Sequence, residues 1–413
     1  PRSGGDYQYL TRAFGKTTGF LFGWAQLCVI LTGSIGCMAF AFADYTVGLG
    51  NWERDATVQL AATAVIVLTG INLLGLMAGK WTQNLLTLAK VAGLFLIVLA
   101  GVFCGQHIPD PVAESAVNSN VAGVGGLGLA LVFVLYAYGG WNDAAFVTAE
   151  VRNIQRNIPL SLILGVALIT GIYVMINGTF LWVLGIEGAR QTWTPAADVL
   201  GGVFGSTAAK CITVLIMISA LGAINGLIFT GSRLFVSLGE DHRVFALLSA
   251  WHPRLNVPTV ALLAQATIAV LLMLVVGTKN GQQAVDHSLS WIGLHSLPWE
   301  QYHGGFETLI AGTAPVFWAF FLLTGISVFV LRIKDRERTR PFRTPLYPIP
   351  PLIFCASCLY MLYASAKYAQ GLCLIGITPV LLGLPVYWFS CHQRPGVQQP
   401  IAKVDKKMQA RPT

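Results

Sequence analysis

Two adjacent glycines, Gly139 and Gly140, interrupt an apolar run within the stretch from Leu127 to Pro159. Glycine has the highest backbone entropy of any residue and no side chain to cover the peptide, so a glycine pair marks a place where a helix can unwind. Unwinding frees backbone carbonyls, which are strong hydrogen-bond acceptors. The residues that flank the pair favour a binding site there; they are Tyr136, Tyr138, Trp141, Asn142 and Asp143.

Lys90 is a second candidate functional residue, because it is a lysine in an apolar run long enough to cross a membrane. It stands about ten residues from the nearer polar end, which places it roughly 10 to 15 Å deep and beyond easy snorkelling. An ammonium at that depth is costly, so it is a candidate for function and should face carbonyl or hydroxyl groups. The alternative is a lysine whose side chain reaches the nearer membrane surface.

The composition places both features in a membrane. Hydrophobic residues make up 55% of the 413 residues, charged residues only 11%, and the mean hydropathy is +0.65. A soluble domain carries about 25% charged residues. In lipid, a helix break survives only where protein or a polar cavity covers it, and broken helices form the binding sites of many secondary transporters. Glycines that merely allow close helix packing would give the same pattern.

About ten membrane spans are predicted from apolar runs of roughly 20 residues. The ranges are 17–43, 57–79, 83–105, 122–150 (the broken one), 159–184, 206–238, 258–277, 308–331, 349–369 and 371–390. With the start of the chain on the cytoplasmic side, most arginines and lysines of the joints fall on that side, including those between Arg332 and Arg343. The net charge of +8 therefore indicates topology and not a nucleic acid partner.

Two joints have features of their own. Thr194 and Pro195 are a typical N-cap and first helical residue, which predicts a short helix after the fifth span. The joint from Thr278 to Glu307 is interpreted as a solvated or membrane-resting loop. It contains His287, His295 and His303, whose spacing fits no metal site.

Metal, redox and enzyme chemistry have little support in the sequence. Cys355 and Cys358 form a C-x-x-C inside a predicted span, where free thiols behave as small hydrophobes. Asp143, Glu150 and the scattered histidines offer no nucleophile, base and orienting group at a usable spacing. We therefore expect no metal, no cofactor and no enzymatic activity.

Several motifs resemble amino acid permeases of the amino acid-polyamine-organocation superfamily, most closely the L-type branch. They are YAYGGWND followed by EVRN and RNIP (Tyr136 to Pro159), the opening PRSGGDYQYLTRAFG, ISALGAINGLIFTGSRLF (Ile218 to Phe235), and LR followed by RPFRTPLYPIPP (Leu331 to Pro351). They follow the family's order and cover nearly the whole chain.

The resemblance implies an all-α polytopic membrane protein with the LeuT-type inverted-repeat fold. It also implies a fragment that lacks the first two of twelve helices, so residues 1–390 would form family helices 3 to 12, and residues 391–413 a basic cytoplasmic tail. In that family the broken first helix binds the substrate carboxylate and the broken sixth helix its ammonium group. We expect this chain to hold the ammonium half.

Site residues follow from the resemblance position by position. The carbonyls of Tyr136, Ala137 and Gly139, at the break with Gly140, match the amine-binding positions, and the Tyr136 ring matches an aromatic gate. Lys90 matches a lysine whose ammonium replaces sodium, beside a hydroxyl that matches Ser219, which implies sodium independence. Trp318 matches a side-chain-pocket position, although a packing role for this tryptophan is equally compatible with the sequence.

The resemblance implies a sodium-independent amino acid transporter that works by alternating access, either proton-coupled or as an exchanger. The alternatives are a transport-incompetent sensor or interaction protein, and a polyamine transporter. The expected partners are an amino acid and the lipid bilayer of the cell membrane. In the family that this chain resembles, some members bind a heavy subunit through a cysteine in the joint between the third and fourth helices. The matching joint here, Asp44 to Ala56, contains no cysteine, so no disulfide-linked heavy subunit is expected.

Overall fold

A computed structural model gives the fold. It describes residues 4–104, 131, 134–135, 137–143, 151, 153–192, 195–291, 293–302, 304–337 and 344–392. All regular structure in these ranges is helical. The helices are α1 (Asp6–Phe14), α2 (Lys16–Ala25), the π-helical turn η1 (Gln26–Ile30), α3 (Leu31–Gly50), α4 (Ala56–Leu73), α5 (Leu76–Cys104), α7 (Ile154–Gln191), α8 (Pro195–Phe204), α9 (Ser206–Asp241), η3 (Arg243–Ser249), α10 (Thr259–Gly277), α11 (Lys279–Trp291), η4 (Trp299–Gln301), α12 (Gly304–Lys334), α13 (Ile349–Ala369), η5 (Gln370–Leu372) and α14 (Cys373–His392).

Eight candidate membrane spans lie in the described part of the chain, and they account for nine of the predicted ones. One candidate, Ile349–Ser390, covers the last two predicted spans, because α13, η5 and α14 follow one another directly, with a turn at Gln370, where φ is 46°. The remaining prediction, residues 122–150, lies mostly outside the described residues. The polytopic all-α architecture expected from hydropathy is therefore confirmed.

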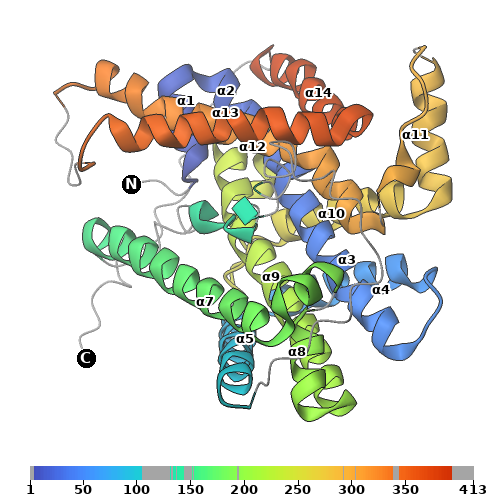
Figure 1. The fold of residues 1–413 in the computed structure, drawn as a ribbon. Helices are drawn as coiled ribbons and strands as arrows, with labels where there is room; N and C mark the ends of the chain where they lie inside the picture. Colours follow the sequence, from blue (N-terminus) through green and yellow to red (C-terminus); the bar gives the residue numbers. More distant parts are fainter. Residues whose placement is uncertain are drawn as a thin grey trace.

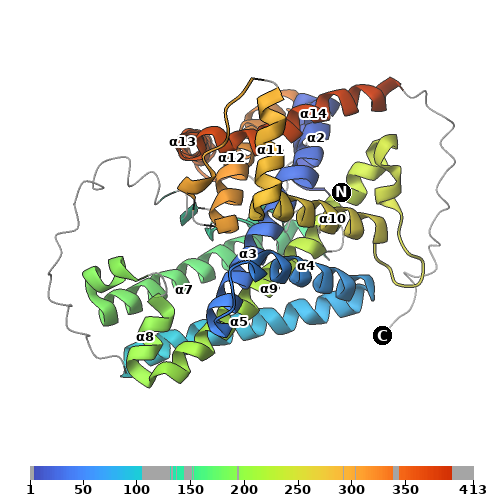
Figure 2. The same ribbon diagram turned by 90° about the vertical axis from the view of Figure 1, so that its right-hand side faces the viewer.

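The core is built around α3, α9 and α12, which lie between α13 and α14 at one end and α5 and α8 at the other (Figures 1 and 2). Small residues bring α3 and α12 together: a Cβ at Gly33 would stand 2.7 Å from Thr313, and one at Gly36 2.8 Å from Leu309. Fully buried side chains such as Phe40 fill the space around them. Close backbone approach through small residues is how membrane helices gain packing contacts.

Buried amides join α4, α5 and α9. The Asn72 amide donates to the Asn225 side chain over 2.7 Å, and Asn225 donates to Gln83 over 2.9 Å and to the Gly79 carbonyl over 3.3 Å. Asn72 and Asn225 are almost completely buried. A satisfied polar network of this kind fixes the register of its helices, because any slip would leave a buried amide unpaired.

Two sequence predictions need correction. The joint from Thr278 to Glu307 is not simply a loop, since Lys279–Trp291 forms the helix α11, which projects from the bundle in Figure 1. The fifth predicted span also runs longer than expected, from Ile154 to Gln191, through a kink at Gly185 where φ is 69°. The short helix predicted at Pro195 is confirmed as α8.

Candidate functional site

The helix break at the glycine pair is present. Tyr138 is still bonded to the helix before it, through a 3.2 Å hydrogen bond from its N–H to the Val134 carbonyl. The backbone then turns through Tyr138–Gly140 and resumes as a 3-10 turn at Trp141–Asp143. Gly140 has a φ of 87°, a conformation that a residue with a Cβ adopts only under strain. Tyr136 lies outside the described residues.

The carbonyl of Ala137 is one of the last carbonyls before the break, where an intact helix would supply a partner from the following turn. Here the hydroxyl of Tyr173 on α7 donates to it over 3.2 Å. Tyr138 and Tyr173 meet edge to face, with ring centroids 5.2 Å apart, and the Tyr138 hydroxyl donates to Thr170 over 3.3 Å. Two tyrosines therefore tie the end of the broken helix to α7.

Sequence reasoning missed this face of α7. Thr170, Tyr173 and Asn177 stand three and four residues apart inside an apolar span, so they share one helix face. Asn177 donates its amide to the Tyr173 carbonyl over 2.8 Å. The polar row was visible in the sequence, and its spacing is the signal that could have identified it.

The restart of the broken helix is anchored separately. The Trp141 ring meets Phe321 of α12 and Phe354 of α13 edge to face, at 6.1 and 6.3 Å between centroids. Asn142 is buried and donates its amide to the Asp6 carboxylate over 3.3 Å. The two sides of the break therefore have different partners, α7 on one side and α1, α12 and α13 on the other.

Burial raises the pKa of Asp6 to about 6, and the hydrogen bond from Asn142 lowers it in part. Its helix, α1, is tied to the ends of two others. Tyr7 donates to Asp241 over 3.0 Å, while at the far end of α1 Arg12 pairs with Asp335 at 2.5 Å and Lys334 donates to the Ala13 carbonyl over 2.7 Å.

Lys90 lies near the middle of the 29-residue α5 and is half-buried. Two close pairs set the register of α5 against α9: Gly93 lies against Leu215, and a Cβ at Gly222 would stand 3.1 Å from Leu86. Lys90 falls between the two α5 residues and Ser219 between the two α9 residues, so they stand at the same level. Among the described residues, no hydrogen bond joins the Lys90 ammonium to Ser219.

Trp318 is buried on α12, with 5% of its surface exposed. Its ring packs on Phe317 and Phe321 at 5.1 and 5.9 Å between centroids, and Phe321 in turn meets Trp141. Its indole N–H has no acceptor among the described residues. The side chain thus belongs to the aromatic cluster beneath the helix restart, and it carries an unused donor.

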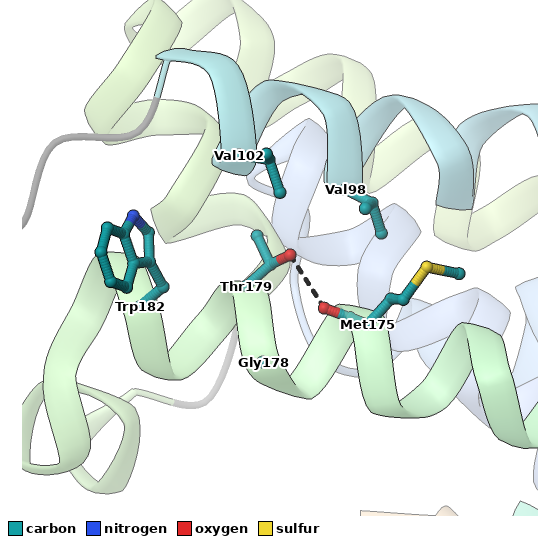
Figure 3. A pocket seen from close by; sticks show the side chains of 6 residues that line it. All are labelled: Val98, Val102, Met175, Gly178, Thr179 and Trp182. Atoms are coloured by element: carbon teal, nitrogen blue, oxygen red, sulfur yellow. Dashed lines mark hydrogen bonds between the residues drawn. The ribbon is translucent and has the colours of Figure 1, made fainter.

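An apolar cavity of about 390 Å³ lies between α5 and α7 (Figure 3). Its lining residues are Val98, Val102, Met175, Gly178, Thr179 and Trp182. The Thr179 hydroxyl bonds its own helix at the Met175 carbonyl, over 2.9 Å, so it offers the cavity little polarity. None of the predicted site residues lines this cavity, which opens on a different face of α7 from Tyr173.

The described residues include no group of three or more His, Cys, Asp or Glu side chains placed to hold a metal ion. Of the three histidines in the joint before α12, His287 accepts a hydrogen bond from Trp291 over 3.2 Å, and His303 lies outside the described residues.

Comparison with known proteins confirms the resemblance to amino acid permeases. A family model described as amino acid permease matches residues 1–384. The serine/threonine exchanger SteT of Bacillus subtilis is 28% identical over 396 residues, which cover 94% of this chain and 82% of that protein. The human b(0,+)-type amino acid transporter 1 is 27% identical, covering 97% of this chain and 77% of its own length. The human cystine/glutamate transporter is 26% identical, covering 94% and 72%.

Proposed function

This chain belongs to the amino acid permease family, and we propose that it is a sodium-independent carrier that moves amino acids by alternating access. The observation that carries the proposal is the break at Tyr138–Gly140. At the C-terminal end of a helix the last carbonyls carry partial negative charge, which attracts an ammonium group. Transporters use such interrupted helices because the freed backbone groups can bind substrate at membrane depth.

In this proposal the carbonyls of Tyr136, Ala137 and Gly139 bind the substrate's amino group. Gly140 supplies the turn that exposes them, because its φ of 87° lets the chain leave the helix without strain. Trp318 borders the side-chain pocket. Its buried N–H, which lacks a described acceptor, is a donor that a polar substrate group could use.

Lys90 provides the fixed positive charge that replaces sodium. Its position near the middle of α5, level with Ser219, supports this role, because a hydroxyl is a suitable partner for an ammonium away from water. Exchange is the favoured mode, since the relative SteT is named an exchanger. Proton coupling is the second mode, and it requires a group that gains and loses a proton during the cycle.

The setting of the carrier is also a proposal. We place it in the cell membrane, with the start of the chain and the tail after residue 391 on the cytoplasmic side, on the strength of the arginine and lysine distribution. Residues 393–413 of that tail lie outside the described residues, whereas α14 continues to His392. We propose that residues 1–390 form a single transport domain that works without a disulfide-linked heavy subunit, since Asp44 to Ala56 contains no cysteine.

Uptake into proteoliposomes tests the proposal. The protein is reconstituted, the vesicles are loaded with unlabelled L-serine or L-leucine, and entry of the labelled amino acid is followed in sodium or choline buffer. We expect equal uptake in the two buffers. Uptake that disappears in choline would contradict sodium independence, and an increase on imposing a proton gradient with empty vesicles would identify proton coupling instead of exchange.

A further inference from the structure

The Ala137 carbonyl already has a hydrogen-bond donor. The Tyr173 hydroxyl reaches it from α7 over 3.2 Å, across 36 residues of sequence. This carbonyl is one of those that the proposed function assigns to the substrate's amino group. A donor from the protein therefore stands where a donor from the substrate has to bind.

We propose that Tyr173 is an internal competitor for the amine site: its hydroxyl fills the Ala137 carbonyl while the site is empty and leaves it when the substrate's amino group binds. The inference rests on the proposed function, because it concerns the same carbonyl. It assigns to α7 a residue that determines how tightly the amine is bound.

The energetics favour such an exchange of partners. A carbonyl at a helix end has no partner from the following turn, so the hydrogen bond from the Tyr173 hydroxyl stabilises the empty carrier. An ammonium group is a stronger donor than a hydroxyl, because hydrogen bonds from charged groups are about twice as strong as neutral ones. The substrate's ammonium group therefore displaces the hydroxyl from the carbonyl. The affinity for the substrate is lower than it would be without this hydroxyl, because the Tyr173 hydrogen bond is lost on binding.

The contacts around Tyr173 hold its ring and its backbone, and they leave the hydroxyl with one hydrogen bond. The Tyr173 ring lies against the Tyr138 ring with an interplanar angle of 89°, and Asn177 holds the Tyr173 backbone carbonyl. The hydroxyl itself makes the single described bond to Ala137. Tyr138 offers no competition for that carbonyl, since its own hydroxyl donates to Thr170. Release of the Tyr173 hydroxyl therefore breaks one described hydrogen bond.

The test compares two effects of Tyr173→Phe on the purified protein. Removing the hydroxyl should lower the melting temperature of the empty protein, because the Ala137 carbonyl loses its donor. It should also lower the dissociation constant for L-serine or L-leucine by about two- to tenfold, the equivalent of one net hydrogen bond. A residue with a purely structural role would lower stability without tightening binding, so the opposite signs are diagnostic.

Two matched variants serve as controls. Tyr138→Phe removes a hydroxyl that bonds Thr170 and should lower stability with no gain in affinity. Tyr363→Phe changes a tyrosine that is 66% exposed on α13 and should alter neither quantity. Unchanged or weaker amino acid binding by Tyr173→Phe would overturn the inference. If the unmodified protein binds and transports neither amino acid, it is the proposed function that fails.

Discussion

Helices α7 and α9 are similar in length and hydropathy, yet the bundle uses them differently. Each supplies a 36-residue candidate span, with mean hydropathy 2.2 for α7 and 2.3 for α9. In the most apolar part of the span, 33% of α9 is buried inside the protein against only 6% of α7. Hydropathy therefore identifies membrane helices without revealing which of them are packed in the core. What separates the two is the kind of contact each one makes.

Helix α9 is held by close backbone approach and by buried amides. Gly222 and Gly239 leave room for neighbouring segments, and Asn225 bonds to α4 and α5. Helix α7 meets the broken helix through two hydroxyl groups, those of Tyr138 and Tyr173. Contacts of the first kind are lost only by repacking, whereas single hydrogen bonds can be exchanged for others. We infer that α9 is fixed, and that α7, which packs on α5 through Thr179 against Gly101, is exchangeable in its contact with the broken helix.

The largest effect is expected at Lys90 of α5, the helix whose Gly93 lies against Leu215 of α9. Lys90→Met keeps the length of the side chain and removes the positive charge that the proposed function puts in place of sodium. Uptake of L-serine or L-leucine should fall by about 100-fold at equal membrane abundance. Lys210→Met, which changes an exposed lysine on α9, is the matched control. Normal uptake by the Lys90 variant would reduce Lys90 to a snorkelling residue.

Because α9 is closely packed and α7 is not, a glycine-to-alanine substitution should have opposite effects on stability in the two helices. A Cβ at Gly239 of α9 would stand 2.6 Å from the Phe245 carbonyl and 2.7 Å from the Ser249 nitrogen, both backbone atoms that cannot turn aside. Gly239→Ala should therefore destabilise the protein by about 1–3 kcal/mol.

Gly171 of α7 is the matched position, because a Cβ there would meet nothing within 4 Å. Gly171→Ala should leave stability unchanged or raise it by up to about 1 kcal/mol through helix propensity. Thermal unfolding in detergent measures both variants. Equal losses at the two positions would remove the distinction between a packed α9 and an open α7.

At the helix break, Gly140→Ala should lower the free energy of unfolding by about 1–2 kcal/mol, because the φ of 87° at this position is unfavourable for any residue with a Cβ. We expect uptake about tenfold lower. Gly139→Leu should block amine binding more directly by filling the approach to the carbonyls. Gly165→Ala, at an open position on α7, is the control for added bulk. Normal substrate affinity in both break variants would mean that the glycines serve packing alone.

The smallest effect concerns Asp6 of α1, which accepts a hydrogen bond from Asn142 in the helix restart. Its pKa of about 6 lies above the ordinary 3.8, so the folded protein binds more protons than the unfolded chain between those values. The free energy of unfolding should therefore fall as pH rises from about 4 to about 6.

Asp6→Asn removes the titrating group, so melting curves recorded across that pH range should lose a downward trend of a few degrees. Glu337→Gln changes an exposed carboxylate beyond α12 and should keep the trend. A trend that survives in Asp6→Asn would assign it to another group.

Sequence patterns identified the spans and the break because both depend on local properties. An apolar run of sufficient length has to cross the membrane, and Gly139 with Gly140 permits a turn whatever lies around it. The amide network was beyond reach for the opposite reason. Asn72 and Asn225 are 153 residues apart, and periodicity tells which face of a helix a residue occupies without naming its partner.

Other features were missed because the competing interpretation looked simpler. Lys279–Trp291 is polar enough to be taken for a loop, but it contains neither proline nor an internal glycine pair, and it folds as α11. The π-helical turn Gln26–Ile30 leaves no mark in composition, since it adds a residue to a continuous apolar run. Trp318 could be assigned to neither packing nor substrate from spacing, and its burial beside Phe321 is compatible with both.

The nine-residue helix α1 has a mechanical consequence. It is a strut about 14 Å long, with Asp6 joined to the restart of the broken helix, Tyr7 to the end of α9, and Arg12 to the end of α12. A short helix does not bend, so force applied at one anchorage reaches the other two in the same step. A movement of the restart away from α9 and α12 therefore has to break one of these three contacts or carry α1 with it.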